Sequence, residues 1–197
     1  MNTSKALVLA SIVAMAVMAF VGPKDAIATE LYSGATTVKA GTLIWSSVEG
    51  SATLTDTSAN PIVTCTRSSV NGTVGNAGAS SATVATSGEI WFEECVQSVT
   101  TVELGSLELH HVAGGKNGTL TAKGFDIVAH VFGVECGYTA GTGTDLGTLT
   151  GSTTGNATMD VNAILSRKTG GFLCPSTARW IANYAITSPT PLHVTAS

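Results

Sequence analysis

The chain has 197 residues, of which only 11% are charged, and it carries a formal net charge of −4 at pH 7. Proteins that bind the phosphate backbone of nucleic acids normally present a basic patch, whereas the nine Lys and Arg residues are scattered along this chain. We therefore expect no nucleic-acid partner. Thirty Thr against six Lys, together with 22 Gly, favour strands and tight turns over helices. A surface so poor in charge is also weakly protected against self-association.

The first residues have the pattern of a secretory signal peptide. Lys5 precedes an apolar run over residues 6–21, and residues 26–28 (AIA) offer the small side chains that a signal peptidase accepts. We expect cleavage after Ala28, which leaves residues 29–197 as a single secreted all-β domain without a membrane span. The alternative is an uncleaved N-terminal anchor, but the apolar run is short for crossing a bilayer. The expected location is extracellular or periplasmic.

Residues 62–95 are predicted to form a β-hairpin. A period of two puts Cys65 and Arg67 on one face of an extended run, and the Asn-Gly pair at 71–72 is a strong signal for a hairpin turn. A disulfide between the two cysteines of this segment would close a loop of about 30 residues. On the chain-entropy model it would stabilise the fold by roughly 3–4 kcal/mol.

The cysteines indicate two disulfides. Four of them lie in the expected secreted part, none in a C-x-x-C pair, and an even number in an exported chain favours disulfide pairing, although three connectivities are open. Zinc ligation is the competing use, but ligating cysteines usually come in close pairs, so we expect neither a metal nor another cofactor. Order along the chain favours Cys65 with Cys95 and Cys136 with Cys174.

Strand candidates recur at a spacing of roughly 8–15 residues, with Gly-rich turns between them, which favours an antiparallel β-sandwich or barrel. The longest apolar run outside the signal, GFDIVAHVFGVEC, predicts a central strand, and residues 89–95 are expected to be covered on both faces. The other predicted strands are two within 31–57 that meet at Glu49-Gly50, then 79–85, 98–109 with a bulge at Gly105, 146–150, 157–163 and 180–187.

Two histidines in sequence, His110 and His111, are the first candidates for a metal site. Adjacent residues of a strand point to opposite faces, so both cannot bind one ion unless the strand bulges. A site would need His130 or His193 to converge from elsewhere. We therefore expect one surface histidine and one packed histidine.

Two further patterns suggest chemistry, and each has a plainer explanation. Glu89, Glu93 and Glu94 surround Trp91, and an acid pair beside an aromatic side chain is what sugar hydrolysis uses. A solvated strand end explains the same residues. The glycines of residues 141–147 (GTGTDLG) imitate a phosphate loop, but no helix pattern follows them. We expect an ordinary loop there.

Four segments resemble one known family: CTRSSVNGTVG, IWFEEC, VECGYTAG and CPSTARWIANYAITSPTPLHV. They are similar to small secreted bacterial β-proteins of the type of the protein activator of alkane oxidation (PraB type). Most members of that family have no assigned function. The resemblance covers about residues 61–194, and its motifs are cysteines and turns. It implies export and a β-fold, and no catalytic residue is carried over from it.

We expect a non-enzymatic accessory protein at or outside the cell surface. The resemblance implies contact with a hydrophobic surface, a lipid or a hydrocarbon such as an alkane, which a low-charge, Thr-rich exterior tolerates. In the first alternative, a closed sheet holds a small hydrophobic ligand in a cavity lined by Phe125, Ile127, Val131 and Trp180. In the second, the acids of 89–94 serve a hydrolase. In the third, a free sheet edge supports self-assembly into surface fibres.

Overall fold

The computed structural model describes residues 29–76, 78–79, 82–84, 89–103, 105–131 and 133–196, and these residues form strands and no helix. The predicted signal peptide, residues 1–28, lies outside the described residues. The strands are β1 (Thr29–Ser33), β2 (Thr36–Thr37), β3 (Leu43–Val48), β4 (Ala52–Thr55), β5 (Pro61–Asn76), β6 (Gly78–Ala79), β7 (Ala82–Val84), β8 (Glu89–Cys95), β9 (Val99–Glu103), β10 (Ser106–His111), β11 (Gly118–Lys123), β12 (Phe125–Val131), β13 (Val134–Ala140), β14 (Asp145–Thr150), β15 (Thr158–Thr169), β16 (Thr177–Ser188) and β17 (Leu192–Ala196).

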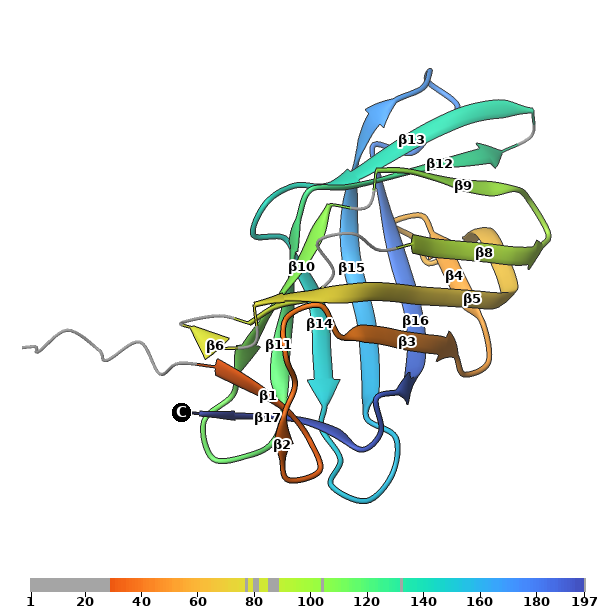
Figure 1. Ribbon diagram of the computed structural model, residues 1–197. Helices are drawn as coiled ribbons and strands as arrows, with labels where there is room; N and C mark the ends of the chain where they lie inside the picture. The colour runs from red at the N-terminus through yellow and green to blue at the C-terminus, as the bar shows by residue number, and fades with distance from the viewer. Residues whose placement is uncertain are drawn as a thin grey trace, which may run out of the picture.

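Most strands belong to one antiparallel network that folds into a sandwich. Its order is β3-β16-β4-β5-β7-β10-β11-β14-β15-β13-β12-β9, and β8 pairs with β5. Figure 1 shows β5 crossing in front of β14, β15 and β16, with β3 and β8 running beside β5, so the two layers pack face to face with their strands crossing. This confirms the predicted all-β, antiparallel fold class.

The two layers share strands instead of standing as separate sheets. β3 and β4 follow one another along the same edge of β16, with a bend at Gly50, whose φ is +87°. Each of them pairs antiparallel with β16 on one side and with β5 on the other. From β5 the pairing continues through β7, β10, β11, β14 and β15 back to β16. The hydrogen bonding therefore closes on itself, and the long strands β5 and β16 tie the layers together.

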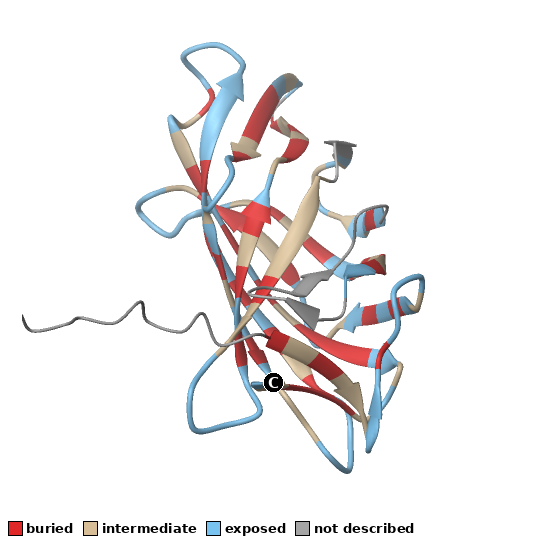
Figure 2. Ribbon diagram, turned by 60° about the vertical axis from the view of Figure 1, so that its left-hand side comes forward, coloured by how far each residue is buried: buried red, intermediate tan, exposed pale blue. Residues whose placement is uncertain are grey.

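The core lies between the layers and centres on Trp180 of β16. Its ring stacks on Phe125 at a centroid distance of 5.3 Å, and it meets Phe92 and Tyr184 edge-on at 6.1 Å each. Along β16 buried residues alternate with less buried ones up to Tyr184, and Figure 2 shows bands of buried and exposed residues along several strands. This is the period of two from which the strand was predicted.

Both disulfides join the cysteines that the chain order favoured. Cys65 is bonded to Cys95, and Cys136 is bonded to Cys174. The first links β5 to β8, which are hydrogen-bonded neighbours, and Cys65 is directly opposite Cys95 in their register. The second links β13 to the loop before β16. The predicted pairings are thus confirmed.

The Asn-Gly pair at 71–72 does not turn the chain, which is a correction to the predicted hairpin. β5 continues through both residues as far as Asn76. The amide of Asn71 is engaged across the sheet, because its Oδ1 accepts a hydrogen bond from Ser46 N at 3.1 Å and the residue pairs with Glu89 of β8. Pairing on both sides outweighs the local turn preference.

The alternation of buried and exposed residues along β5 also differs from the prediction. Cys65 is buried, but Thr66 and Arg67 are both exposed, and the buried positions then continue at Ser68. The paired strand, β8, also breaks its alternation of faces at this place, where Glu94 has a φ of +52°. Arg67 therefore lies on the outer face, away from Cys65.

The apolar run predicted as one central strand is a hairpin instead. It forms β12 and β13, which pair along their whole length from Phe125↔Ala140 to Val131↔Val134. Gly133 takes a φ of +79° at the turn, a conformation that favours glycine. Both strands are rich in buried residues, so hydropathy alone does not mark the boundary between them.

Gly105 is a corner and not a bulge within one strand. β9 on one side of it pairs with β12, while β10 on the other side pairs with β7 and β11. A Cβ at this position would lie 1.2 Å from the carbonyl oxygen of Gly124. Only glycine allows this backbone approach, and the chain uses it to change neighbours.

The N-terminal and C-terminal strands of the described chain form a small sheet that was not predicted. β1 pairs with β17 over five residue pairs, from Thr29↔Ala196 to Ser33↔Leu192. Leu31 and Val194 are fully buried beneath it. Each strand is short, and its partner lies at the far end of the sequence, so local periodicity gave little signal.

Candidate functional site

Three exposed apolar side chains gather at one end of the molecule. Val96 is 85% exposed, Phe172 is 94% exposed and Leu173 is 60% exposed. Val96 and Leu173 line the same open groove of about 450 Å³, and Phe172 is the chain neighbour of Leu173. We call these three residues the apolar tip. Water-exposed apolar groups that lie together mark contact sites in many proteins.

Each loop of the apolar tip is fixed directly beside a disulfide. Val96 follows Cys95, which is bonded to Cys65, and Leu173 precedes Cys174, which is bonded to Cys136. The backbone adds hydrogen bonds, including Val96 N to Thr64 O at 2.9 Å. These bonds hold the apolar side chains outward, although folding back into the core would remove them from water.

The loop of residues 170–176 is further tied by Arg167. Its guanidinium donates to the carbonyl oxygen of Gly171 at 3.0 Å and to that of Cys174. Cys174 N also donates to Gly171 O at 3.1 Å. Both ends of the Phe172-Leu173 pair are therefore held.

The groove beside the tip has an apolar floor and a polar rim. Ile62, Val131 and Pro175 contribute apolar surface to it, while Asp56 and Gln97 line it with polar groups. Hydrogen bonds from the side chain and backbone of Asn60 hold the pKa of Asp56 below its usual range, against the small opposing effect of burial. The rim thus carries a negative charge at neutral pH.

The apolar tip was missed in the sequence. Phe172 and Leu173 stand alone between Gly-Gly and Cys-Pro, so they belong to no periodic pattern, and the segment 167–171 was predicted as an exposed loop. In the structure β15 extends to Thr169, which shortens that loop. The available signal was an aromatic and a Leu placed directly before a predicted disulfide cysteine.

The cavity proposed for a small ligand is filled by its own lining. Phe125 stacks on Trp180, and the void between Trp180 and Ile127 holds only about 10 Å³. A second internal void, near Leu109 and Leu120, holds about 40 Å³. Ligand pockets are typically about 300–1,000 Å³. Val131, the fourth predicted lining residue, lines the external groove instead.

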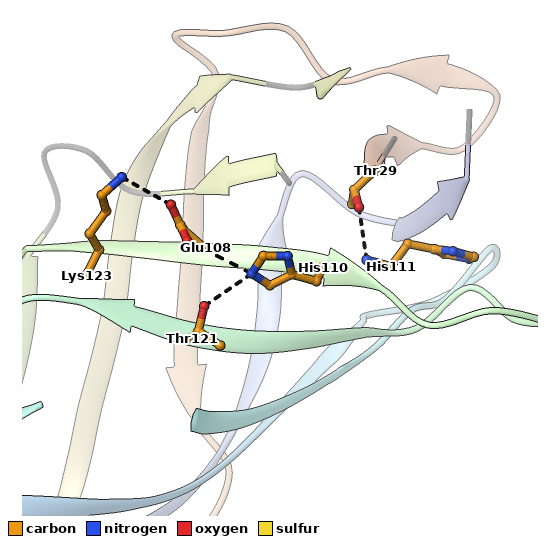
Figure 3. Close-up of polar contacts among 6 residues, drawn as sticks. All are labelled: Thr29, Glu108, His110, His111, Thr121 and Lys123. Atoms are coloured by element: carbon orange, nitrogen blue, oxygen red, sulfur yellow. Dashed lines mark hydrogen bonds and ion pairs between the residues drawn. The ribbon is translucent and has the colours of Figure 1, made fainter. Parts of the chain in front are cut away.

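The two adjacent histidines point away from each other, as expected for strand neighbours (Figure 3). His110 Nε2 lies 3.3 Å from Thr121 Oγ1 and 4.0 Å from Glu108 Oε2, and Glu108 in turn pairs with Lys123. His111 Nε2 lies 2.9 Å from the carbonyl oxygen of Gly115. Both histidines are partly exposed, whereas one had been expected to be packed.

The other two histidines do not join them. His130 Nε2 lies 3.2 Å from Glu135 Oε1, and His193 is buried in β17 against the ring of Tyr32 at 5.7 Å. Burial, and then the nearby charge of Lys116, lower the pKa of His193, so it is neutral at neutral pH. No group of three or more potential metal-ligating side chains occurs within the described parts of the chain.

The acids around Trp91 lie on the outer face of β8. Glu93 Oε2 is 3.1 Å from Arg67 Nη1, and Glu94 Oε1 is 3.7 Å from the same nitrogen. Glu94 also accepts a hydrogen bond from Thr66 at 2.8 Å. Trp91 is 54% exposed, which corrects the expectation that both faces of this strand are covered.

The glycine-rich segment 141–147 forms a turn and the start of a strand. Gly143 has a φ of +81° in the turn that leads into β14, and Asp145 Oδ1 accepts a hydrogen bond from Gly147 N at 2.9 Å. The chain continues as strand, not helix, after this turn. The arrangement lacks the helix N-terminus that a phosphate loop needs.

Comparisons with known proteins give no match: no family model, no curated protein and no solved structure is significantly similar to this chain. In the described part of the chain, no helix has the length and hydropathy to cross a membrane. The two disulfides are of the kind found in oxidising compartments, which agrees with a secreted or periplasmic protein.

Proposed function

We propose that this chain is an exported, non-enzymatic protein that attaches to hydrophobic surfaces, such as a hydrocarbon droplet or a lipid layer, through its apolar tip. The observation that carries the proposal is the placement of Val96, Phe172 and Leu173 in water beside two disulfides. The resemblance to the alkane-oxidation activator type supports a hydrocarbon as the contact. The disulfides support export.

The energetics suit reversible attachment. Burying a large apolar side chain is worth about 1.5–3 kcal/mol, so the three residues of the apolar tip together supply roughly 5 kcal/mol when they enter an apolar phase. That is a weak interaction for one molecule. Many copies on one droplet or one cell surface would add their contributions.

A non-enzymatic role also fits the acids near Trp91. Two of the three, Glu93 and Glu94, hold the guanidinium of Arg67, and such ion-paired carboxylates are poor candidates for the proton transfers of sugar hydrolysis. Self-assembly through a sheet edge stays a prediction that no observation here tests.

The proposal is tested by partition of the purified, exported protein between buffer and hexadecane droplets. We expect the wild type to adsorb and a V96S/F172S/L173S variant to lose most of its adsorption. Ile164 is 61% exposed, close to the 60% of Leu173, but it lies on β15 outside the tip. I164S is therefore the matched control and should adsorb as the wild type does. A wild type that stays in the buffer, or a triple variant that adsorbs equally well, would refute the proposal.

A further inference from the structure

A second open groove lies on the outer face of β3, β5 and β8 and shares no lining residue with the groove beside the apolar tip. It has a volume of about 420 Å³, and its two largest lining side chains are Trp45 on β3 and Trp91 on β8. Trp45 is 49% exposed and Trp91 is 54% exposed. About half of the surface of each tryptophan is thus in contact with water, on the face of the sheet that points away from the core.

The two tryptophans stand on opposite sides of β5. β3 and β8 each pair with β5, and neighbouring strands are about 4.8 Å apart, so the two backbones are separated by about 10 Å across the sheet. Trp91 is opposite Ser69 in the register. The rings therefore flank a strip of β5 and do not stack on each other.

The floor between the rings is built from hydroxyl and amide groups. Ser47, Ser69, Asn71 and Thr187 line the groove. Asn71 Nδ2 donates to Ser69 Oγ at 3.3 Å, and Thr187 Oγ1 donates to the carbonyl oxygen of Trp45 at 3.2 Å. These contacts fix the polar groups before any ligand arrives. Among the described residues, neither indole N–H donates to a protein acceptor, so both can serve a ligand.

The charges in the groove cancel. Its lining contains one cation, Arg67, and one anion, Glu93, and they form an ion pair with an N–O distance of 3.1 Å. A neutral ligand meets no unpaired charge in this lining, whereas an anionic or cationic polymer would have to compete with the pair.

We propose that this groove binds a neutral polysaccharide. A pyranose ring has an apolar face of C–H groups and a rim of hydroxyls, which matches two exposed indoles separated by fixed hydroxyl and amide groups. A proline-rich peptide is the other ligand that favours Trp, but it docks in narrow slots between aromatic side chains. Here the width of β5 separates the rings. The site goes beyond the proposed attachment to hydrophobic surfaces and shares no residue with the apolar tip.

The test is native affinity electrophoresis of the purified protein in gels that contain a soluble polysaccharide. The panel is β-glucan, xylan, galactomannan and dextran as neutral polymers, with alginate as an anionic one. We expect retardation by at least one neutral polymer, and about tenfold or more weaker binding for W45A and for W91A, as for aromatic hot spots in other interfaces. W91F should keep most of the affinity because it keeps an aromatic face. Circular dichroism confirms that each variant is folded.

The control is F172A in the apolar tip, which should bind the polysaccharide as the wild type does. Equal binding by the wild type and the W45A/W91A variant overturns the inference, as does the absence of retardation by every neutral polymer. Tryptophan-dependent binding of alginate alone, or of a polyproline peptide alone, also overturns it. Loss of hexadecane adsorption in the tip variant leaves this result untouched, so the two proposals fail separately.

Discussion

Leu173 and Cys174 are neighbours in the chain, yet Leu173 is 60% exposed while Cys174 is 2% exposed and bonded to Cys136. One peptide bond thus connects a side chain held in water to a buried disulfide. Val96, which is 85% exposed, likewise follows Cys95, which is partly buried and bonded to the buried Cys65. The cross-links anchor the two loops that carry the apolar tip, in addition to stabilising the fold.

Removing the Cys136–Cys174 disulfide should therefore affect both stability and adsorption. The bond spans a sequence separation of 38 residues, so a C136A/C174A variant should lose roughly 4 kcal/mol of unfolding free energy on the chain-entropy model. Urea denaturation measures this loss. Under conditions where the variant is still folded, its adsorption to hexadecane should also fall, because the Phe172 loop loses its anchor. Unchanged adsorption would show that the disulfide does not position the tip.

Two adjacent glycines offer a matched test of the same loop. Gly170 has a φ of +114°, and a Cβ there would lie 2.5 Å from Cys174 Sγ and 3.0 Å from Glu135 O. At Gly171 a Cβ would meet nothing within 4 Å. We expect G170A to lower the free energy of unfolding by about 1–3 kcal/mol and G171A to change it little. Thermal or urea unfolding of both variants checks this, and equal effects would contradict the loop geometry.

A buried hydrogen bond joins β5 to β16. Ser68 Oγ and Tyr184 Oη lie 2.8 Å apart, and both residues are buried. Burial raises the pKa of Tyr184 far above its usual value, so the phenol stays protonated. Y184F should cost about 1–2 kcal/mol because the Ser68 hydroxyl loses its partner. In a double-mutant cycle with S68A the two losses should not add, and strict additivity would show that the bond contributes nothing.

The ion pair of Lys168 with Asp126 predicts a specific loss of stability in acid. Burial alone would raise the pKa of Asp126, but hydrogen bonds from Lys168 and Thr139 and the charge of Lys168 outweigh it and hold the pKa below its usual value. The carboxylate therefore stabilises the fold fully above about pH 4, and this contribution is lost as the pH falls through the lower, folded value. D126N should be less stable than the wild type at neutral pH, and the gap should narrow in acid. A gap that is independent of pH would contradict the pairing.

The sequence predicted the strands best where a period of two is long and bounded by turn residues. β8 was predicted with its observed ends, and chain order favoured both disulfides. These features depend on local pattern or on cysteine count. Gly50 was likewise a local signal, but the chain bends there and does not reverse, because β3 and β4 both run antiparallel to β16.

The errors arose where distant pairing overrides local preference. At Asn71, strands on both sides outweigh the turn signal. At Gly133 the reason is different, because a tight turn divides an apolar run whose two halves are both largely buried, and composition does not mark it. The apolar tip and the groove between Trp45 and Trp91 depend on which loops and strands become neighbours in space. Periodicity along the chain carries no such information.

The most direct test of the account places a reporter at Phe172, the most exposed residue of the apolar tip. A F172W variant, measured as a difference spectrum against the wild type with its three tryptophans, reports the surroundings of this one side chain. On addition of hexadecane droplets we predict a blue shift of the emission at position 172, and none for the control I164W, because only the tip enters the apolar phase. Adsorption of the protein with no shift at position 172, or with the shift at 164 instead, would contradict the account.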